Sequence, residues 1–184
     1  GSREFFLDHL SERFGFYSQA MFWAALYQFA AAWLLFFFVP LIVLLTVGCE
    51  TIASLGLGKG DTRAGLWVAI VGLLLVSLPG GLLAGNLEQF RAEYPLAREA
   101  VSSVWKFFWY ELAYGALYYL AWEFFFRGVL QIGMSRYLGV IGALLFQTAC
   151  STLLHIGKPW AEVWAALAAG IVFGLVAARL RTVW

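Results

Sequence analysis

Charged residues are scarce in this chain. Only 12% of its 184 residues are Asp, Glu, Lys or Arg, whereas 62% are hydrophobic, and the mean hydropathy is +0.80. Soluble domains carry about 25% charged residues, so this composition excludes an ordinary soluble domain. With a net charge of +1 and neither a basic stripe nor an acidic tail, we expect no nucleic-acid partner. The composition predicts an integral membrane protein that has the lipid bilayer as a partner.

Cysteine and proline are also rare, with two and four residues. Cys49 and Cys150 both lie in apolar stretches, where cysteine usually behaves as a small buried hydrophobic residue, so they do not indicate a redox compartment. The length suits one domain and no internal repeat appears, so we expect a single integral membrane domain over residues 3–184. Gly1 and Ser2, without an initiator Met, are typical of the remnant of an expression tag.

Long apolar stretches separated by polar intervals predict an all-α, polytopic transmembrane helical bundle. A helix needs about 20 apolar residues to cross a bilayer, and the pattern indicates about five such spans. An N-terminal interfacial amphipathic helix, from Arg3 to about Arg13, precedes them. Pro40 predicts a kink in the first span, and Pro79-Gly80-Gly81 an interruption near the end of the second. The expected spans are about Tyr17–Gly48, Ala64–Ala84, Val104–Met134, Tyr137–His155 and Trp160–Leu180.

A carboxylate and a guanidinium lie deep inside the third apolar stretch. Glu123 and Arg127 are i and i+4 neighbours, so on a helix they share one face and can pair. Each ionised side chain near the bilayer centre costs about 2.5–3.5 kcal/mol on insertion scales, which favours a functional reason for keeping two of them. The alternative is a structural ion pair that pins the helix to its neighbours. Glu111, in the same stretch, falls on a different face of the helix.

A second polar group follows at the end of the fourth stretch. His155 is succeeded by Lys158 and Glu162, and on its own it would be an interfacial histidine bonded to water or to a carbonyl. Together with Glu123 and Arg127, these residues form a polar set carried by three consecutive stretches. A carboxylate in a low-dielectric pocket is a competent general base towards water. A histidine opposite it could donate to the oxygen that gains negative charge when water attacks a carbonyl.

Other kinds of site fit the sequence less well. The chain has no serine nucleophile elbow and no His-Glu-x-x-His zinc motif. Glu123, His155 and Glu162 could together bind a divalent ion, but Lys158 and Arg127 beside them would oppose a cation. We therefore expect no metal and no cofactor.

Three blocks of residues resemble a known family by their order and spacing. The chain is similar to the CPBP family, which comprises the CAAX prenyl endopeptidases and the bacteriocin-processing or self-immunity (ABI) proteins, over residues 104–184. The resemblance implies an all-helical bundle whose motif residues meet in an intramembrane cavity. It also implies a glutamate peptidase with Glu123 activating water, Arg127 as its partner and His155 stabilising the oxyanion. The blocks are Glu123-Phe124-Phe125-Phe126-Arg127-Gly128, Leu154-His155-Ile156-Gly157-Lys158-Pro159 and Gly170-Ile171-Val172-Phe173-Gly174-Leu175-Val176.

The chain departs from the family pattern at three places. Trp122 stands where the first motif has its first Glu, and Ser151 stands where the second motif has Phe. The Trp-Glu variant resembles a bacterial branch in which Glu162 supplies a second carboxylate, which implies a bacterial inner (plasma) membrane. Trp122, Lys158 and Glu162 are second-tier or substrate-binding candidates. The last family motif, a His followed by Asn or Asp, belongs to a helix beyond Trp184; either the native protein has that helix or its catalytic set is incomplete.

The leading functional prediction is an intramembrane endopeptidase. Its substrate would be a lipidated or hydrophobic-tailed protein, or a leader peptide, cleaved at a membrane-proximal peptide bond by glutamate-activated water. The alternative from a different class is a non-catalytic membrane self-immunity or peptide-binding protein, in which the polar set only recognises a ligand. A third reading is a proton-coupled carrier, since buried Glu and His side chains also relay protons.

Overall fold

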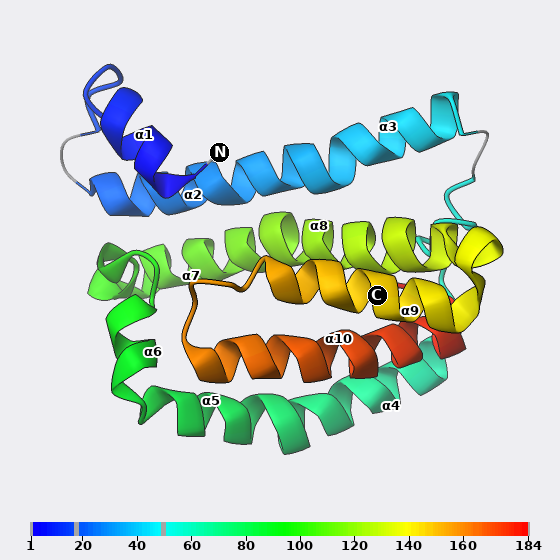
Figure 1. The fold of residues 1–184 in the computed structure, drawn as a ribbon. Coiled ribbons are helices and arrows are strands. Elements are labelled where there is room, and N and C mark those ends of the chain that lie inside the picture. Colours follow the sequence, from blue (N-terminus) through cyan, green and yellow to red (C-terminus); the bar gives the residue numbers. More distant parts are fainter. Residues whose placement is uncertain (1, 17–18, 49–50, 184) are drawn as a thin grey trace. The chain divides into compact units, whose positions relative to one another are not determined.

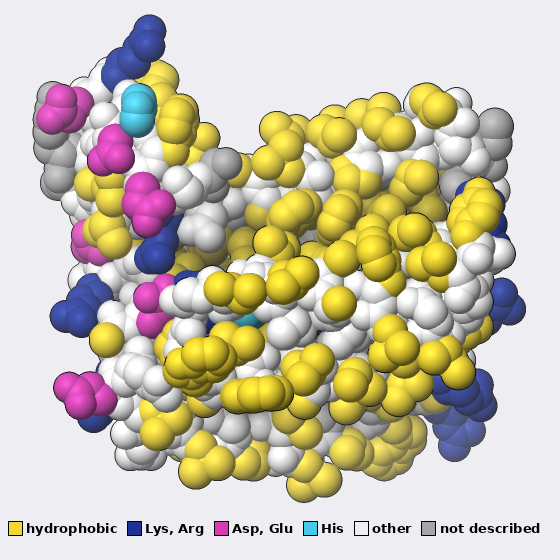
Figure 2. Space-filling model, viewed as in Figure 1, with side chains coloured by type: hydrophobic (Ala, Val, Ile, Leu, Met, Phe, Trp, Pro, Cys, Tyr) yellow, Lys and Arg dark blue, Asp and Glu magenta, His cyan; other side chains and the backbone are white. Residues whose placement is uncertain are grey.

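The computed structural model describes residues 2–16, 19–48 and 51–183, and throughout these ranges it consists of helices and turns without strands (Figure 1). The predicted all-α membrane fold is confirmed. Figure 2 shows hydrophobic side chains over most of the visible surface of the long helices, while the charged side chains gather near helix ends. The expected start of the first span at Tyr17, together with Cys49 and Trp184, lies outside the described residues.

Three helical runs among the described residues are long and apolar enough to cross a membrane: Ala20–Thr46, Thr62–Gly85 and Trp160–Leu180. The other two expected spans, about Val104–Met134 and Tyr137–His155, correspond to helical runs at Val104–Gly133 and Ser135–Leu153, and the second of these is interrupted at Gly139. Both carry polar side chains that lower their mean hydropathy, so their crossing of the membrane stays a prediction.

The chain forms two compact units. Unit 1 comprises residues 1–39 and 88–122, and unit 2 comprises residues 40–87 and 123–184. The boundary between them falls inside one helical run, between Trp122 and Glu123. The expectation of a single membrane domain stays a prediction, and each unit is described by itself below.

Unit 1 begins with a short amphipathic helix, α1 (Arg3–His9), which packs on α2 (Ala20–Ala32). Helix α1 ends before Arg13, the end predicted from the sequence. The N–H groups of Leu10 and Ser11 both donate to the Phe6 carbonyl at 2.9 Å, and the chain turns there. The remaining elements are η1, a π-helix (Trp33–Phe38); α6 (Glu88–Glu93); η3, a 3₁₀-helix (Arg98–Ser102); α7 (Val104–Ala113); η4, a π-helix (Tyr114–Tyr119); and α8 (Leu120–Glu123) up to Trp122.

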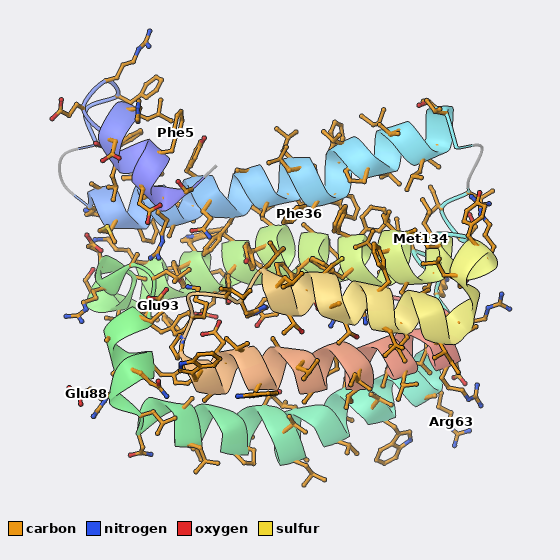
Figure 3. All side chains as sticks on the ribbon, in the orientation of Figure 1. Phe5, Phe36, Arg63, Glu88, Glu93 and Met134 are labelled. Carbon is orange, nitrogen blue, oxygen red and sulfur yellow. The ribbon has the colours of Figure 1, made fainter. Side chains whose placement is uncertain are left out.

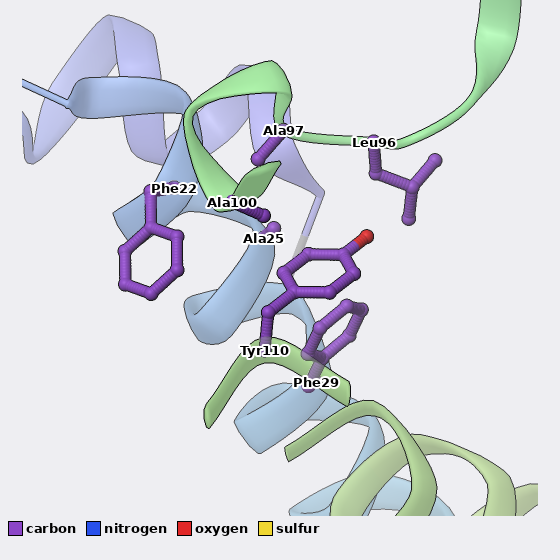
Figure 4. Close-up of a cluster of buried hydrophobic side chains, with 7 residues drawn as sticks. All are labelled: Phe22, Ala25, Phe29, Leu96, Ala97, Ala100 and Tyr110. Atoms are coloured by element: carbon purple, nitrogen blue, oxygen red, sulfur yellow. The ribbon is translucent and has the colours of Figure 1, made fainter. Parts of the chain in front are cut away.

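The core of unit 1 is built from aromatic rings and small residues (Figure 4). Phe29 on α2 is fully buried, and its ring centroid lies 5.4 Å from that of Tyr110 and 5.1 Å from that of Tyr114. Small side chains let the helices approach the rings closely. The buried cluster consists of Phe22, Ala25, Phe29, Leu96, Ala97, Ala100 and Tyr110.

Unit 2 is organised around three consecutive helices. These are η5, a π-helix (Phe124–Gly133), α9 (Ser135–Leu153) and α10 (Trp160–Leu180); α9 packs on η5 and on α10, and α10 also packs on η5. Met134 forms the turn between η5 and α9 (Figure 3), so α9 runs antiparallel to η5, and α10 runs antiparallel to α9 (Figure 1). Gly139 interrupts the regular geometry of α9 with φ 68° and ψ 167°, a conformation open only to glycine.

The other helices of unit 2 are α3 (Val39–Thr46), α4 (Thr62–Gly72), the π-helix η2 (Leu73–Ser77) and α5 (Leu78–Gly85). The first residue of α3, Val39, belongs to unit 1. The polar turn expected between the first two spans packs against the end of α10. The Gly56 carbonyl accepts from the Val183 N–H at 2.9 Å, and the Gly58 carbonyl accepts from the Thr182 hydroxyl at 2.8 Å.

The two proline sites in the apolar runs produce π-helical turns rather than breaks. η1 immediately precedes Val39-Pro40, and η2 immediately precedes Leu78-Pro79. Proline lacks the N–H that would close the preceding α-helical turn, and a wider turn accommodates its ring. The helix continues through Pro79-Gly80-Gly81 to Gly85, contrary to the predicted interruption, because apolar surroundings leave the backbone no other hydrogen-bond partners.

Candidate active site

Glu123 and Arg127 form an ion pair at the start of η5. The Arg127 Nε lies 3.2 Å from the Glu123 Oε2, at the i, i+4 spacing that the sequence predicts. The Arg127 side chain is 4% exposed, whereas that of Glu123 is 25% exposed. The pair therefore has a buried cation and an accessible carboxylate. It occupies a π-helical segment, a geometry that occurs frequently at functional sites.

Arg127 also contacts the neighbouring helix. Its guanidinium carbon lies 5.9 Å from the ring centroid of Phe173 on α10, within the range of a cation–π interaction. Its buried Nη1 has no hydrogen-bond partner among the described residues. Arg127 thus offers a buried positive charge and a spare donor beside the Glu123 carboxylate.

His155 lies on the turn that follows α9. Its Nδ1 is 2.8 Å from the Ser151 carbonyl oxygen. A carbonyl only accepts, so Nδ1 carries the proton and donates it to Ser151. For the other ring nitrogen to donate to an oxyanion as well, the ring must be doubly protonated.

Lys158 and Glu162 are half-buried at the connection between α9 and α10. The Lys158 N–H donates to the His155 carbonyl at 3.0 Å, and the Glu162 N–H donates to the Pro159 carbonyl at 2.8 Å. Glu162 occupies the first turn of α10, where a negative charge is favourable to the helix dipole.

The topology of unit 2 brings these residues to one end of the three-helix group. Glu123 immediately precedes η5, His155 follows α9, and Glu162 opens α10. Because consecutive helices run antiparallel, the start of η5, the end of α9 and the start of α10 lie at the same end (Figure 1). This end of unit 2 is the candidate site.

Trp122 belongs to unit 1. Its ring stacks on Tyr118 with centroids 6.0 Å apart and meets Phe36 edge-on at 6.4 Å. Within unit 1 it extends the row of aromatic side chains, and its role towards a substrate stays a prediction.

Two buried residues of unit 2, Gln131 and Gln147, were not among the residues predicted from the sequence. The Gln131 Nε2 donates to the Gly174 carbonyl at 2.6 Å, and the Gln147 Nε2 donates to the Gly170 carbonyl at 2.8 Å. A signal for them was present: Gln131 follows Arg127 at i+4, and a glutamine in an apolar helix often bonds to a neighbouring helix.

No group of three or more His, Cys, Asp or Glu side chains that could hold a metal ion occurs in the described part of the chain. The ligand set considered from the sequence, Glu123 with His155 and Glu162, is not assembled as such a group.

The C-terminal part of the chain was compared with known protein families. Residues 103–184 match the model of the family described as type II CAAX prenyl endopeptidase Rce1-like. No significant match was found among curated proteins or among solved structures. The matched segment contains Glu123, Arg127 and His155, and it confirms the predicted relationship to the CPBP family. Residues 103–184 are thus similar to the Rce1-like type II CAAX prenyl endopeptidases, a family of membrane proteases.

Proposed function

We propose that this protein is an intramembrane endopeptidase of a bacterial inner membrane. It cleaves a membrane-proximal peptide bond of a lipidated or hydrophobic-tailed protein, or of a leader peptide. Similarity to a protease family supports a peptide or protein substrate. The observation that carries the proposal is the Glu123–Arg127 pair, which sets a carboxylate with an accessible edge next to a buried cation inside the matched segment.

The difference in exposure supports different roles for the two members of the pair. Glu123 is accessible enough to meet water, so it is the general base. Arg127 is too deeply buried to meet a bulky substrate directly, so it holds the carboxylate in place from behind. An i, i+4 pair on one helix has a fixed geometry that does not depend on substrate binding.

The proposed reaction needs no cofactor. Glu123 takes a proton from water while the water oxygen attacks the carbonyl carbon of the substrate, and the carbonyl oxygen gains a negative charge. Doubly protonated His155 donates a hydrogen bond to that oxygen. The tetrahedral intermediate then collapses, the C–N bond breaks, and the leaving amine takes the proton from Glu123. Lys158 and Glu162, half-buried at the same end, position the substrate.

The test is a comparison of two Glu→Gln variants from the same helical run. Glu123→Gln removes the general base, and we expect kcat to fall by roughly 100-fold or more. Glu111→Gln makes the same chemical change at an exposed position of α7, and we expect it to leave kcat unchanged. The substrate is a fluorogenic peptide that ends in a prenylated CAAX sequence, supplied to the protein in proteoliposomes.

The outcomes separate the proposal from its rival. Full cleavage by Glu123→Gln contradicts the role of Glu123. Peptide binding without cleavage by the unmodified protein contradicts the protease proposal and favours the non-catalytic peptide-binding alternative.

A further inference from the structure

Two buried glutamines bind the backbone of α10 one helical turn apart. Gln131 reaches from η5 to the Gly174 carbonyl, and Gln147 reaches from α9 to the Gly170 carbonyl. Both side chains are almost completely buried, with 2% of Gln131 and 0% of Gln147 exposed. Each of the two neighbouring helices is therefore hydrogen-bonded directly to the backbone of α10.

The two glycines make these bonds possible. A Cβ at Gly174 would lie 2.7 Å from the Gln131 Oε1 and 2.8 Å from the Gln147 Nε2. A Cβ at Gly170 would lie 2.9 Å from the Thr148 Cγ2. These separations are below van der Waals contact. A larger residue at position 174 would crowd both amides, and one at position 170 would crowd Thr148, whose hydroxyl accepts from the Gln147 Nε2 at 2.9 Å.

The arrangement leaves polar atoms unsatisfied. Neither Gln131 Oε1 nor Gln147 Oε1 has a hydrogen-bond partner among the described residues, and both atoms are buried. Leaving such atoms without partners opposes folding, and apolar side chains of the same size would avoid that cost. Stability alone therefore does not explain why these amides are buried. The helix positions that they fix provide an explanation.

The two hydrogen bonds set the relative heights of the candidate site residues, that is, their positions along the helix axes. His155 lies about eight residues beyond Gln147 along α9, and Glu162 lies about eight residues before Gly170 along α10. Because α9 and α10 are antiparallel, the Gln147–Gly170 bond brings His155 and Glu162 to the same height. Glu123 lies about eight residues before Gln131, so the Gln131–Gly174 bond puts it within roughly one helical turn of that height.

We propose that Gln131, Gln147, Gly170 and Gly174 form an amide clamp that fixes the register of η5, α9 and α10, and that the two glutamines are positioning residues for peptide cleavage at Glu123 and His155. The fixed register stands on the hydrogen bonds alone, whereas its consequence for catalysis rests on the proposed function.

The register is tested by pulsed electron spin resonance on the full chain in proteoliposomes. Spin labels are attached at Leu145→Cys on α9 and Trp164→Cys on α10, both exposed, after Cys49 and Cys150 are replaced by Ser. The two sites are offset along the helix axis, so a slide of one helix past the other changes their distance. In the double variant with Gln131→Leu and Gln147→Leu, we expect the distance distribution to shift or broaden by about 5 Å, one helical pitch.

Two control variants keep this test interpretable. Gln28→Leu makes the same change on α2 of unit 1, and we expect an unchanged distance distribution in unit 2. Gln147→Glu keeps a donor at the clamp when its buried carboxyl is protonated, and we expect it to preserve the distance of the unmodified protein. If the double variant does not fold, each single Leu variant is measured by itself. An unchanged distribution in folded Leu variants overturns the clamp.

Kinetics with the prenylated peptide test the catalytic consequence. For folded Gln131→Leu and Gln147→Leu, we expect kcat to fall about 10-fold while KM stays within about 2-fold, because the site is misaligned rather than blocked. Shifted label distances without any cleavage by the unmodified protein would leave the clamp standing and remove the proposed function. Normal kcat in variants whose label distances have shifted would overturn the positioning role.

Discussion

The packed centres of the two units differ in chemistry. In unit 1, the buried cluster contains phenylalanine, tyrosine, leucine and alanine. Outside this cluster, Ser11 is the single buried polar residue among the described residues of unit 1. In unit 2, the described residues with buried polar side chains are Arg127, Gln131, Gln147, Thr148, Ser151 and Thr182. The composition of the units accounts for part of this difference, because 24 of the 34 aromatic residues fall in unit 1 and ten in unit 2.

The two packed centres are therefore specified in different ways. An aromatic core is stabilised by filled volume, and it tolerates exchanges that preserve shape. A polar core depends on the position of each donor and acceptor, because a displaced partner leaves a buried atom unsatisfied. We therefore expect substitutions in unit 1 to change stability alone, and substitutions in unit 2 to change stability and chemistry together.

The largest expected effect on stability is at Arg127. Arg127→Ala leaves the Glu123 carboxylate without its cation and leaves a cavity beside Phe173. We expect the free energy of unfolding to fall by about 3–5 kcal/mol. Glu123→Gln keeps the shape and an oxygen that accepts a hydrogen bond, so we expect a smaller loss of about 1–3 kcal/mol. Thermal unfolding in detergent measures both, and equal losses would count against a buried pair.

Phe29→Ala tests the aromatic core of unit 1. We expect a loss of about 3 kcal/mol, at the lower end of the range for such truncations because the surrounding tyrosine rings can relax into the space. Cleavage per folded molecule should not change. Phe38→Ala, at an exposed position of η1, is the matched control and should have little effect. A fall in kcat for folded Phe29→Ala would break the distinction between the units.

A pair of Gly→Ala variants, one in each unit, tests the smallest expected changes in stability. In Gly174→Ala the new methyl group would overlap the Leu144 Cδ1 and crowd both glutamine amides, and we expect a loss of about 1–3 kcal/mol. In Gly115→Ala, on η4 of unit 1, nothing lies within 4 Å of the new Cβ, and we expect a gain of about 0.5–1 kcal/mol. Denaturant unfolding distinguishes the two, and a neutral Gly174→Ala would contradict the close approach of α10.

Much of the fold could be predicted from local pattern. The helical stretches follow from runs of apolar residues, and the Glu123–Arg127 pair follows from i, i+4 spacing on any helix. The early end of α1 at His9 and the continuation of the helix through Pro79 could not be predicted, because both depend on where backbone hydrogen bonds find partners.

The candidate site was predictable only in part, for a similar reason. His155 and Glu162 were recognisable as unusual residues at the ends of apolar stretches. Gln131 and Gln147 were recognisable as polar residues within apolar helices, but a glutamine there has the same sequence pattern whether it faces lipid, a neighbouring helix or a site. Their carbonyl partners on α10 lie far away in the sequence.

The sequence by itself determined the membrane class, the helical stretches, the motif residues and the pairing of Glu123 with Arg127, because each depends on composition or on neighbours within one helical turn. Only the tertiary structure decided that α10 is held through Gly170 and Gly174, and that Trp122 packs with the aromatic rings of unit 1. Those features depend on which helix faces meet and at what register, and the packing of several helices sets that register together.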